Sequence, residues 1–289
     1  MEPSVARRMW QVLEPYHAVV YFSPQTRQAM EDAGLRGFWR GYFAGRAAPL
    51  GRTPAPVVTA TFFGFRPSMV ERAIPAVWDL IEPAEAAAAR MRGADATLRE
   101  VLGDAVSSPE LAEAADLARR ATDACDPVGR ALFAAHLDLP WPEEPHLVLW
   151  HAATLVREHR GDTHNAALVA AGVDGCQAQV LAAAAGRASR PILQASRSWS
   201  DEEWDAAAGR LAARGLLERT PGGDDQLTDA GRALVDDVEA RTDAGSLAPW
   251  AHLGENVTER LRTLVRPHAR AVQAQDWFPT ITPLGLPAD

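Results

Sequence analysis

The sequence predicts a mainly α fold, with a helical N-terminal half and a C-terminal half in which helices flank a small β-hairpin. Apolar residues recur at three- and four-residue steps in Ser4–Phe22, Glu85–Leu102 and Pro109–His136, which is the periodicity of amphipathic helices. A glycine-rich turn between two short β-type segments, Leu216–Arg219 and Gln226–Thr228, predicts the hairpin. The 289 residues, 47% of them hydrophobic, suffice for one or two domains with a full core.

The N-terminal half is expected to be helical with one exception. Pro15 should kink the first helix or split it into two, and Ser23 should cap the second. The exception is a β-branched and aromatic segment, which is expected to be a short strand or a buried turn. The elements in order are helices over Ser4–Phe22, Pro24–Gly34 and Phe38–Phe43, the strand or turn Val57–Phe65, and a helix over Pro67–Asp79.

The middle of the chain predicts a bundle and then a linker. The helices Glu85–Leu102 and Pro109–His136 are expected to face solvent, with a break in the second at Asp126–Pro127. Three prolines in Leu139–Pro145 predict a linker. The expected domains are therefore a helical domain, 1–139, and a second domain, 145–289.

Local signals define the C-terminal elements. Ser200 and Glu203 form a capping-box pattern, and Gly215 supplies a left-handed helix stop. Gly161 is expected to end one helix and Asp162 to cap the next. The last helix is amphipathic enough to support a homodimer or to pack on its own chain. The expected helices are Pro145–His159, Thr163–Ala171, Val173–Ala185, Asp201–Arg214, Asp229–Thr242 and Leu253–Gln275.

Composition narrows the function classes. All 29 basic residues are arginine, which with the heavy alanine usage suggests a GC-rich, actinobacterial genome. Without lysine, pyridoxal-phosphate Schiff-base chemistry is excluded, and no phosphate-binding glycine loop is present. Cys125 and Cys176 lack the spacing of a zinc site or a disulfide framework. Neither a signal peptide nor a membrane-spanning segment is evident, so we expect a cytoplasmic protein with no membrane partner.

The C-terminal pattern resembles the winged-helix half of MarR-type transcription regulators. The resemblance is carried by a helix, Arg214-Gly215-Leu216-Leu217, a glycine-rich hairpin, and Leu227-Thr228-Asp229-Ala230-Gly231-Arg232-Ala233-Leu234. It covers about Ile192–Asp243 and implies a winged helix-turn-helix with a β-hairpin wing; the N-terminal half could be a diverged copy. The segment Glu158–Asp162, together with this wing, also resembles an actinobacterial family described only as helix-turn-helix proteins, which implies no activity.

The segment that would face DNA, if the chain bound DNA as MarR proteins do, is acidic. In a DNA-binding MarR protein, the helix before the wing presents polar and basic groups to the major groove. Here that helix opens with Ser200-Asp201-Glu202-Glu203-Trp204-Asp205. The segment from Ala195 to Gly245 contains twelve acidic residues and six arginines, a net charge of 6 − 12 = −6. Together with the chain's net charge of −9, this disfavours a nucleic-acid partner.

Arg157–His164 is the segment densest in ionisable groups. Glu158, His159 and Asp162 could provide acid–base catalysis or hold a metal, although their spacing matches no established metal motif. Arg160 could pair with a ligand anion, and His164 lies close by in sequence. The alternative is structural: Asp162 caps a helix, and Arg157 and Arg160 pair with Glu158 and Asp162.

A second candidate segment surrounds His17. The histidine is flanked by Tyr16 and Tyr21 in an apolar helix, and the same half of the chain is rich in aromatic residues. Either His17 is a hydrogen-bonded core residue, or His17 and Tyr21 line an apolar pocket with a few polar groups.

These observations favour a small-molecule-binding protein on a MarR-like scaffold that has lost DNA binding, with a role in specialised metabolism or drug sequestration. Its ligand-binding residues would be His17, Tyr21, Arg160 and His164. One alternative is an enzyme that uses Glu158, His159 and Asp162, and another is a MarR-type regulator. The sequence specifies no cofactor and no metal.

Overall fold

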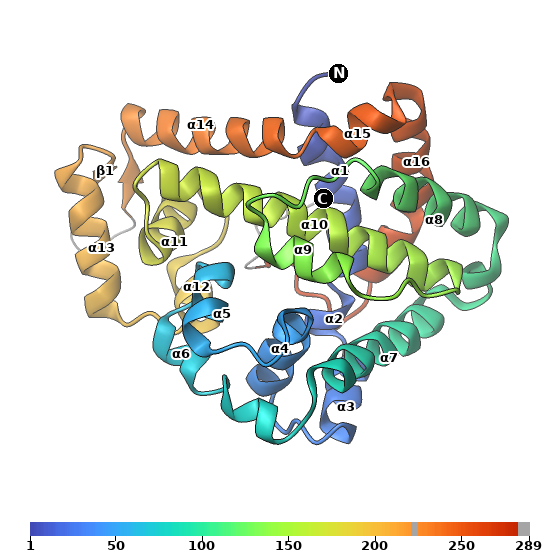
Figure 1. Cartoon of the computed structure of the whole chain (residues 1–289). Coiled ribbons are helices and arrows are strands. Elements are labelled where there is room, and N and C mark those ends of the chain that lie inside the picture. The colour runs from blue at the N-terminus through green and yellow to red at the C-terminus, as the bar shows by residue number, and fades with distance from the viewer. Residues whose placement is uncertain (221–224, 283–289) are drawn as a thin grey trace. The chain divides into compact units, whose positions relative to one another are not determined.

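The computed structural model describes residues 1–220 and 225–282, and it is mainly helical (Figure 1). These residues form helices α1 to α16, three short 3-10 helices and one two-stranded sheet. The chain divides into two compact units. Unit 1 comprises Met1–Pro54, Ala73–Thr163 and Asp243–Pro279, and unit 2 comprises Ala55–Arg72, the described residues of His164–Thr242, and Thr280–Thr282. The turn 221–224 of the predicted hairpin lies outside the described residues.

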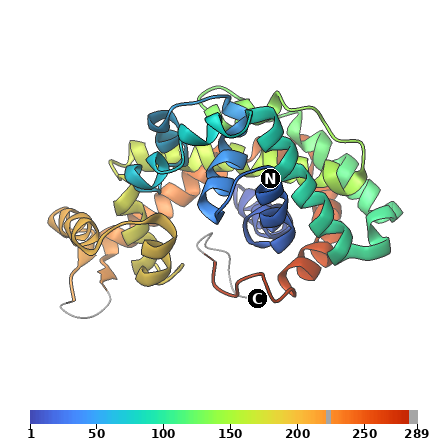
Figure 2. The same ribbon diagram turned by 90° about the horizontal axis from the view of Figure 1, so that it is seen from below.

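Unit 1 is built around two helix pairs. α3 packs along α7, and α1 packs against α16, which also contacts α8. Figure 2 looks onto α1 with α16 beside it. The helices of unit 1 are α1 (Ser4–His17), α2 (Val19–Phe22), α3 (Pro24–Asp32), α4 (Phe38–Ala47), α7 (Pro83–Leu102), α8 (Pro109–Thr122), α9 (Ala131–Leu137), α15 (Ala248–Leu253), α16 (Glu255–Gln273) and the first part of α10 (Pro145–Ala170), with 3-10 turns at Ala48–Leu50, Ala76–Asp79 and Gly103–Ser107.

The α3–α7 contact is close because a glycine faces the N-terminal turn of α3. A Cβ atom on Gly93 would lie 2.5 Å from the Cα atom of Thr26. Ser23 caps α3 by accepting a hydrogen bond from the Thr26 amide, and its hydroxyl lies 2.8 Å from that of Thr97 on α7. The predicted Ser23 cap is therefore confirmed, and it also ties the two helices together.

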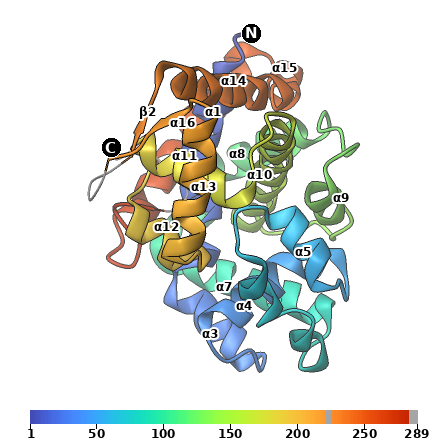
Figure 3. The same ribbon diagram turned by 90° about the vertical axis from the view of Figure 1, so that its left-hand side faces the viewer.

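Unit 2 has its own core, centred on Trp204 and the inward residues Ala207, Ala208 and Leu211 of α13. Figure 3 shows α13 with α11 beside it. The short strands pair antiparallel, with Leu217 opposite Leu227. The elements of unit 2 are α5 (Ala55–Phe62), α6 (Pro67–Glu71), the end of α10, α11 (Gly175–Ala184), α12 (Arg190–Arg197), α13 (Asp201–Ala213), β1 (Leu217–Glu218), β2 (Gln226–Leu227) and α14 (Asp229–Gly245) up to Thr242.

The local signals around α13 are confirmed. Ser200 and Glu203 form the reciprocal capping box, and Gly215 has φ +71° after the helix ends. These signals depend on side chain to backbone hydrogen bonds within a few residues, so they can be recognised without knowledge of the tertiary fold.

Two predicted elements of the N-terminal half differ, and a third divides as expected. The segment Val57–Phe65 contains no strand: Ala55–Phe62 is the helix α5. The helix expected over Pro67–Asp79 ends at Glu71 and is followed by a 3-10 turn beyond Pro75. The segment Val57–Phe65 is rich in β-branched residues, which favour a strand where another strand can pair with them. The only strands among the described residues are β1 and β2, which pair with each other. The helix expected over Ser4–Phe22 divides at Ala18, close to the expected break at Pro15.

The largest correction concerns α10, which runs unbroken from Pro145 to Ala170. Gly161 does not end a helix, and Asp162 does not cap one that begins at Thr163. A single glycine costs a helix only about 1 kcal/mol, which packing along a long buried helix can offset. The expected turn between His159 and His164 is therefore absent.

The segment Leu139–Pro145, which is expected to link two domains, lies inside unit 1. Division into folding domains 1–139 and 145–289 stays a prediction. The apolar side of α16, including Leu261, Leu264 and Val265, is buried within unit 1. No single helix of the described residues is both long and apolar enough to cross a membrane; α10 and α11 meet the two criteria only together, as a pair bent by 97°.

Candidate ligand site

The sequence-predicted cluster does not converge on one point. Because α10 is continuous, successive residues leave the helix about 100° apart. Glu158, Arg160 and Asp162 each find a different partner in unit 1, and His164 belongs to unit 2, where its Nδ1 lies 3.0 Å from the Thr242 hydroxyl.

Glu158 is the centre of a buried ion-pair network. Its carboxylate accepts hydrogen bonds from Arg157 (Nη1–Oε2, 2.8 Å) and Arg46 (Nη2–Oε2, 3.2 Å), and its side chain is 1% exposed. Burial alone would raise the pKa of Glu158, but the Arg157 and Arg46 guanidiniums outweigh it and hold the pKa well below its usual range. Arg157 also reaches Glu14, whose carboxylate accepts a hydrogen bond from the Trp10 indole.

Asp162 caps a helix, but not the expected one. Its Oδ2 accepts hydrogen bonds from the backbone amides of Leu132 (2.9 Å) and Phe133 (3.0 Å) at the start of α9. His159 is buried edge-on to the Phe133 ring, and its Nδ1 has no hydrogen-bond partner among the described residues. The capping chemistry predicted for Asp162 is thus present across two helices that are distant in sequence.

Arg160 is paired with a carboxylate of its own unit. Its Nη1 donates to Asp243 Oδ1 over 2.8 Å, and Arg7 donates to the other oxygen of the same carboxylate. The Arg160 guanidinium lies over the Trp10 ring, 5.6 Å from its centroid. The structure thus shows Arg160 in an ion pair with Asp243, a carboxylate distant in sequence.

His17 and Tyr21 form an ordered chain of hydrogen bonds. The Thr154 hydroxyl donates to the Trp150 carbonyl, so it accepts from His17 Nδ1 over 2.9 Å. His17 Nε2 then accepts from the Tyr21 hydroxyl, also over 2.9 Å. Burial lowers the pKa of His17 well below its usual value, in keeping with a neutral ring. His17 is a core residue that orients Tyr21.

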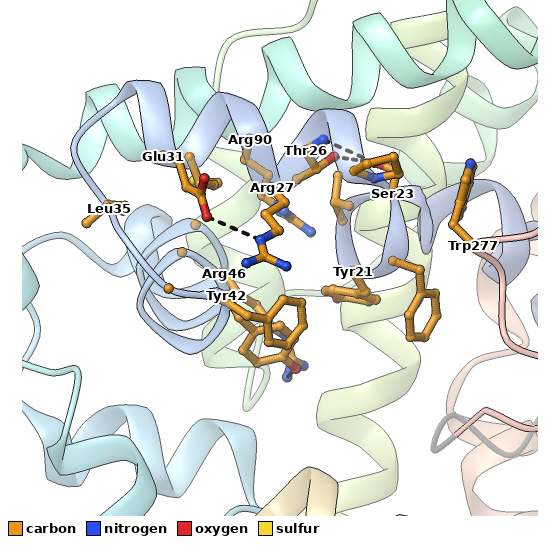
Figure 4. Close-up of a pocket in the computed structure, with 18 residues that line it drawn as sticks. Tyr21, Ser23, Thr26, Arg27, Glu31, Leu35, Tyr42, Arg46, Arg90 and Trp277 are labelled. Atoms are coloured by element: carbon orange, nitrogen blue, oxygen red, sulfur yellow. Dashed lines mark hydrogen bonds and ion pairs between the residues drawn. The ribbon is translucent and has the colours of Figure 1, made fainter.

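Tyr21 faces a cavity of about 270 Å³ within unit 1 (Figure 4). This volume far exceeds the roughly 15 Å³ that one water molecule needs. The cavity walls come from α2, α3, α4, α7 and the segment after α16, and its aromatic residues are Tyr21, Phe22, Phe38, Tyr42 and Trp277. The combination of aromatic walls with a few polar groups is typical of small-molecule sites.

Two glycines on α4 shape the cavity. A Cβ atom on Gly45 would lie 2.6 Å from the terminal methyl of Met30 and 3.4 Å from Cδ of Arg90, and one on Gly41 would lie 3.0 Å from Cβ of Met30. The glycines therefore let Met30 and Arg90 lie directly against α4. A larger residue at position 45 would push the Met30 methyl aside.

Arg90 is the unusual polar group of this cavity. Its side chain projects from the buried side of α7 and is 4% exposed. His136 Nδ1 donates to the Leu132 carbonyl, so its Nε2 accepts from Arg90 Nη1 over 3.4 Å. The guanidinium also lies 5.2 Å from the centroid of the Trp150 ring. Arg90 Nη2 is buried and has no hydrogen-bond partner in the described part of the chain.

Sequence reasoning found Tyr21 but missed Arg90, Arg46 and Met30. Arg90 carried a signal: it lies at helical spacing with Ala86, Ala89, Gly93, Ala94 and Thr97, so it occupies the apolar side of its helix. An arginine in such a position must bury its charge or extend past its neighbours. No group of three or more His, Cys, Asp or Glu residues that could hold a metal occurs within residues 1–220 and 225–282.

The outward side of α13 is acidic, and nearby arginines are engaged by it. Arg190 pairs with Asp201 (2.8 Å) and Asp205 (3.0 Å), and Arg219 also reaches Asp205. Arg210, the arginine of α13 itself, pairs with an aspartate, Asp174, over 2.8 Å. Positive charge near this surface is thus locally compensated.

The fold and these surfaces define a helical protein with helix-turn-helix elements and an open cavity in unit 1. A family model described as "Helix-turn-helix family" matches residues 6–279, and the chain belongs to this family. No curated protein and no solved structure matches the chain significantly.

Proposed function

We propose that this protein binds a small organic molecule in the cavity of unit 1, and that α11 to α14 with the β1–β2 hairpin form a MarR-like winged helix without DNA-binding activity. The observation that carries the ligand proposal is the cavity itself, which combines aromatic walls with a buried arginine. Small-molecule sites are concave and lined mainly by apolar and aromatic side chains with a few polar groups. An open pocket of about 270 Å³ with such walls supports a binding role.

A panel of aromatic acids, amides and alcohols tests this proposal by thermal unfolding. Several compounds should raise the melting temperature of the wild-type protein, because a ligand that binds only the folded state stabilises it. Val20→Trp, which fills the cavity from α2, and Gly45→Ala, which displaces Met30, should weaken that response.

Val128→Trp is the matched control, because Val128 is exposed and does not line the cavity. It should respond to the panel as the wild type does. The cavity is not a binding site if no compound raises the melting temperature of the wild type. The same holds if Val20→Trp and Gly45→Ala respond to the compounds as strongly as the wild type does.

DNA binding is the second candidate, and family membership is the observation that favours it. Against it, phosphates would approach the carboxylates of Asp201, Glu202 and Asp205, where like charges repel. Moreover, Arg190 and Arg210 would have to leave their ion pairs before they could contact DNA. The acidic surface of α13 therefore supports a winged helix that has lost this activity.

Fluorescence anisotropy with the protein's own promoter DNA separates the two candidates. We expect binding weaker than about 10⁻⁶ M at physiological salt, in the range of non-specific association. Asp201→Asn with Asp205→Asn should strengthen binding by releasing Arg190 from both carboxylates. Tight, sequence-specific and salt-dependent binding by the wild type would instead establish a regulator.

We do not extend the proposal to catalysis by the Glu158 segment. The Glu158 carboxylate accepts hydrogen bonds from two arginines, Asp162 accepts from two backbone amides, and the His159 ring packs perpendicular to the Phe133 ring. These contacts give each group a structural role in unit 1.

A further inference from the structure

In the described part of the chain, the buried charged side chains near the cavity have partners of opposite charge, with the exception of Arg90. Glu158 is shared by Arg46 and Arg157, and Glu14 accepts hydrogen bonds from Arg157 and Trp10. Arg90 has no carboxylate partner in the described part of the chain; its contacts are an imidazole nitrogen and an indole ring. A buried cation with only neutral partners is costly, because desolvation is not offset by an opposite charge.

Arg90 also borders the cavity of unit 1, and its Nη2 group lacks a hydrogen-bond acceptor. Nη2 exposes almost no surface, so an acceptor on a bound molecule would pair with it after a small shift of the Arg90 side chain towards the cavity. Burial is the main cause that lowers the pKa of Arg90 from its usual high value, and a bound anion would counteract that cost. Arginine pairs well with planar carboxylates.

The polar groups at the cavity favour an anion that needs few hydrogen-bond donors. Tyr21 already donates its hydroxyl proton to His17, so it is not available as a donor to a ligand. A phosphate dianion needs several donors, whereas a carboxylate can be satisfied by one or two. The rest of the cavity wall is mostly aromatic or aliphatic.

Resting on the proposed ligand-binding function, we propose that the ligand is an aromatic carboxylic acid whose carboxylate pairs with Arg90 and whose ring system lies against Tyr21 and Tyr42. The ion pair between the ligand carboxylate and Arg90 would lie at the buried end of the cavity. Arg27, at the same cavity, is exposed and already paired with Glu31 (3.2 Å), so it serves as a matched control.

Calorimetric titration with 2-naphthoate, 2-naphthamide and 2-naphthyl phosphate tests this. The acid and the amide share their shape and differ in charge. The wild type should bind the acid at least about tenfold more tightly than the amide, and more tightly than the phosphate, because a charge-assisted pair is stronger than a neutral one. Arg90→Met should lose the preference for the acid while amide binding changes little, and Arg27→Gln should keep the preference.

Thermal unfolding without ligand supplies a second measurement. Arg90→Met should leave the melting temperature unchanged or raise it, because the variant removes an unpaired buried charge. Equal wild-type affinity for acid and amide, tighter binding of the phosphate, or an acid preference that survives in Arg90→Met would overturn the ligand class while leaving a cavity-binding protein. If the wild type binds none of the three, the proposed function fails as well.

Discussion

Lowering the pH from about 6.5 towards 4 should sharply reduce the free energy of unfolding. Burial lowers the pKa of His136 and His159 to about 4 and that of His151 to about 3, and it lowers the pKa of His17 in the same direction. In the unfolded chain these rings take up protons near pH 6.5. In the folded chain they stay neutral until their lowered pKa is reached, so protonation favours unfolding.

The sign follows from proton uptake. A histidine with a lowered folded pKa leaves stability intact above about pH 6.5 and removes about 1.4 kcal/mol for each pH unit below it, until the folded pKa is reached. Glu14 and Asp162 act oppositely, because burial raises the pKa of their carboxyls. The histidines outnumber these two groups, so a net loss is expected.

Urea unfolding at a series of pH values measures this loss. His151→Gln should make the pH dependence shallower by about one proton, whereas His252→Gln, at an exposed position in α15, should leave it unchanged. A free energy of unfolding that stays constant between pH 7 and 5 would contradict the neutral, buried state of these rings.

Glu158→Ala should destabilise the folded protein by about 3–5 kcal/mol. The substitution leaves Arg46 and Arg157 without the carboxylate that both contact. Their side chains are only 9% and 17% exposed, so water cannot fully replace that carboxylate. Removing one member of a buried ion pair costs more than the pair contributes, because the remaining charge stays desolvated. Denaturant unfolding at neutral pH measures the change.

Glu202→Ala is the matched control, because Glu202 is an exposed carboxylate on α13. Its free energy of unfolding should change by less than about 0.5 kcal/mol. Glu158→Gln keeps the shape of the side chain but not its charge, so it should still be clearly destabilised. Wild-type stability in both Glu158 variants would show that this carboxylate is not the centre of the network.

Much of the helical architecture could be predicted from sequence because it depends on local patterns. Ser23, Ser200 with Glu203, and Gly215 specify helix ends through contacts within a few residues. The segment 57–65 and the course of α10 could not be predicted in this way. In both, contacts distant in sequence outweigh local preference: the Thr61 carbonyl of α5 accepts a hydrogen bond from Asn165, and Asp162 caps α9 instead of its own segment.

The candidate site was predicted only in part. The ionisable residues between 157 and 164 are present as a polar region, yet the structure explains Glu158 and Arg160 by ion pairs with Arg46 and Asp243. Tyr21 borders the aromatic cavity, and its role in ligand binding stays a prediction. Arg90 was missed because its significance depends on which carboxylates lie near it, and the sequence of α7 alone contains no information about that.

A crystal structure of the protein grown with 2-naphthoate tests the central claim most directly. We predict electron density for one naphthoate in the cavity of unit 1, with its ring against Tyr21 and Tyr42 and its carboxylate within hydrogen-bond distance of Arg90 Nη2. A cavity without naphthoate at a saturating concentration of the acid, or naphthoate bound only elsewhere on the chain, would contradict the claim.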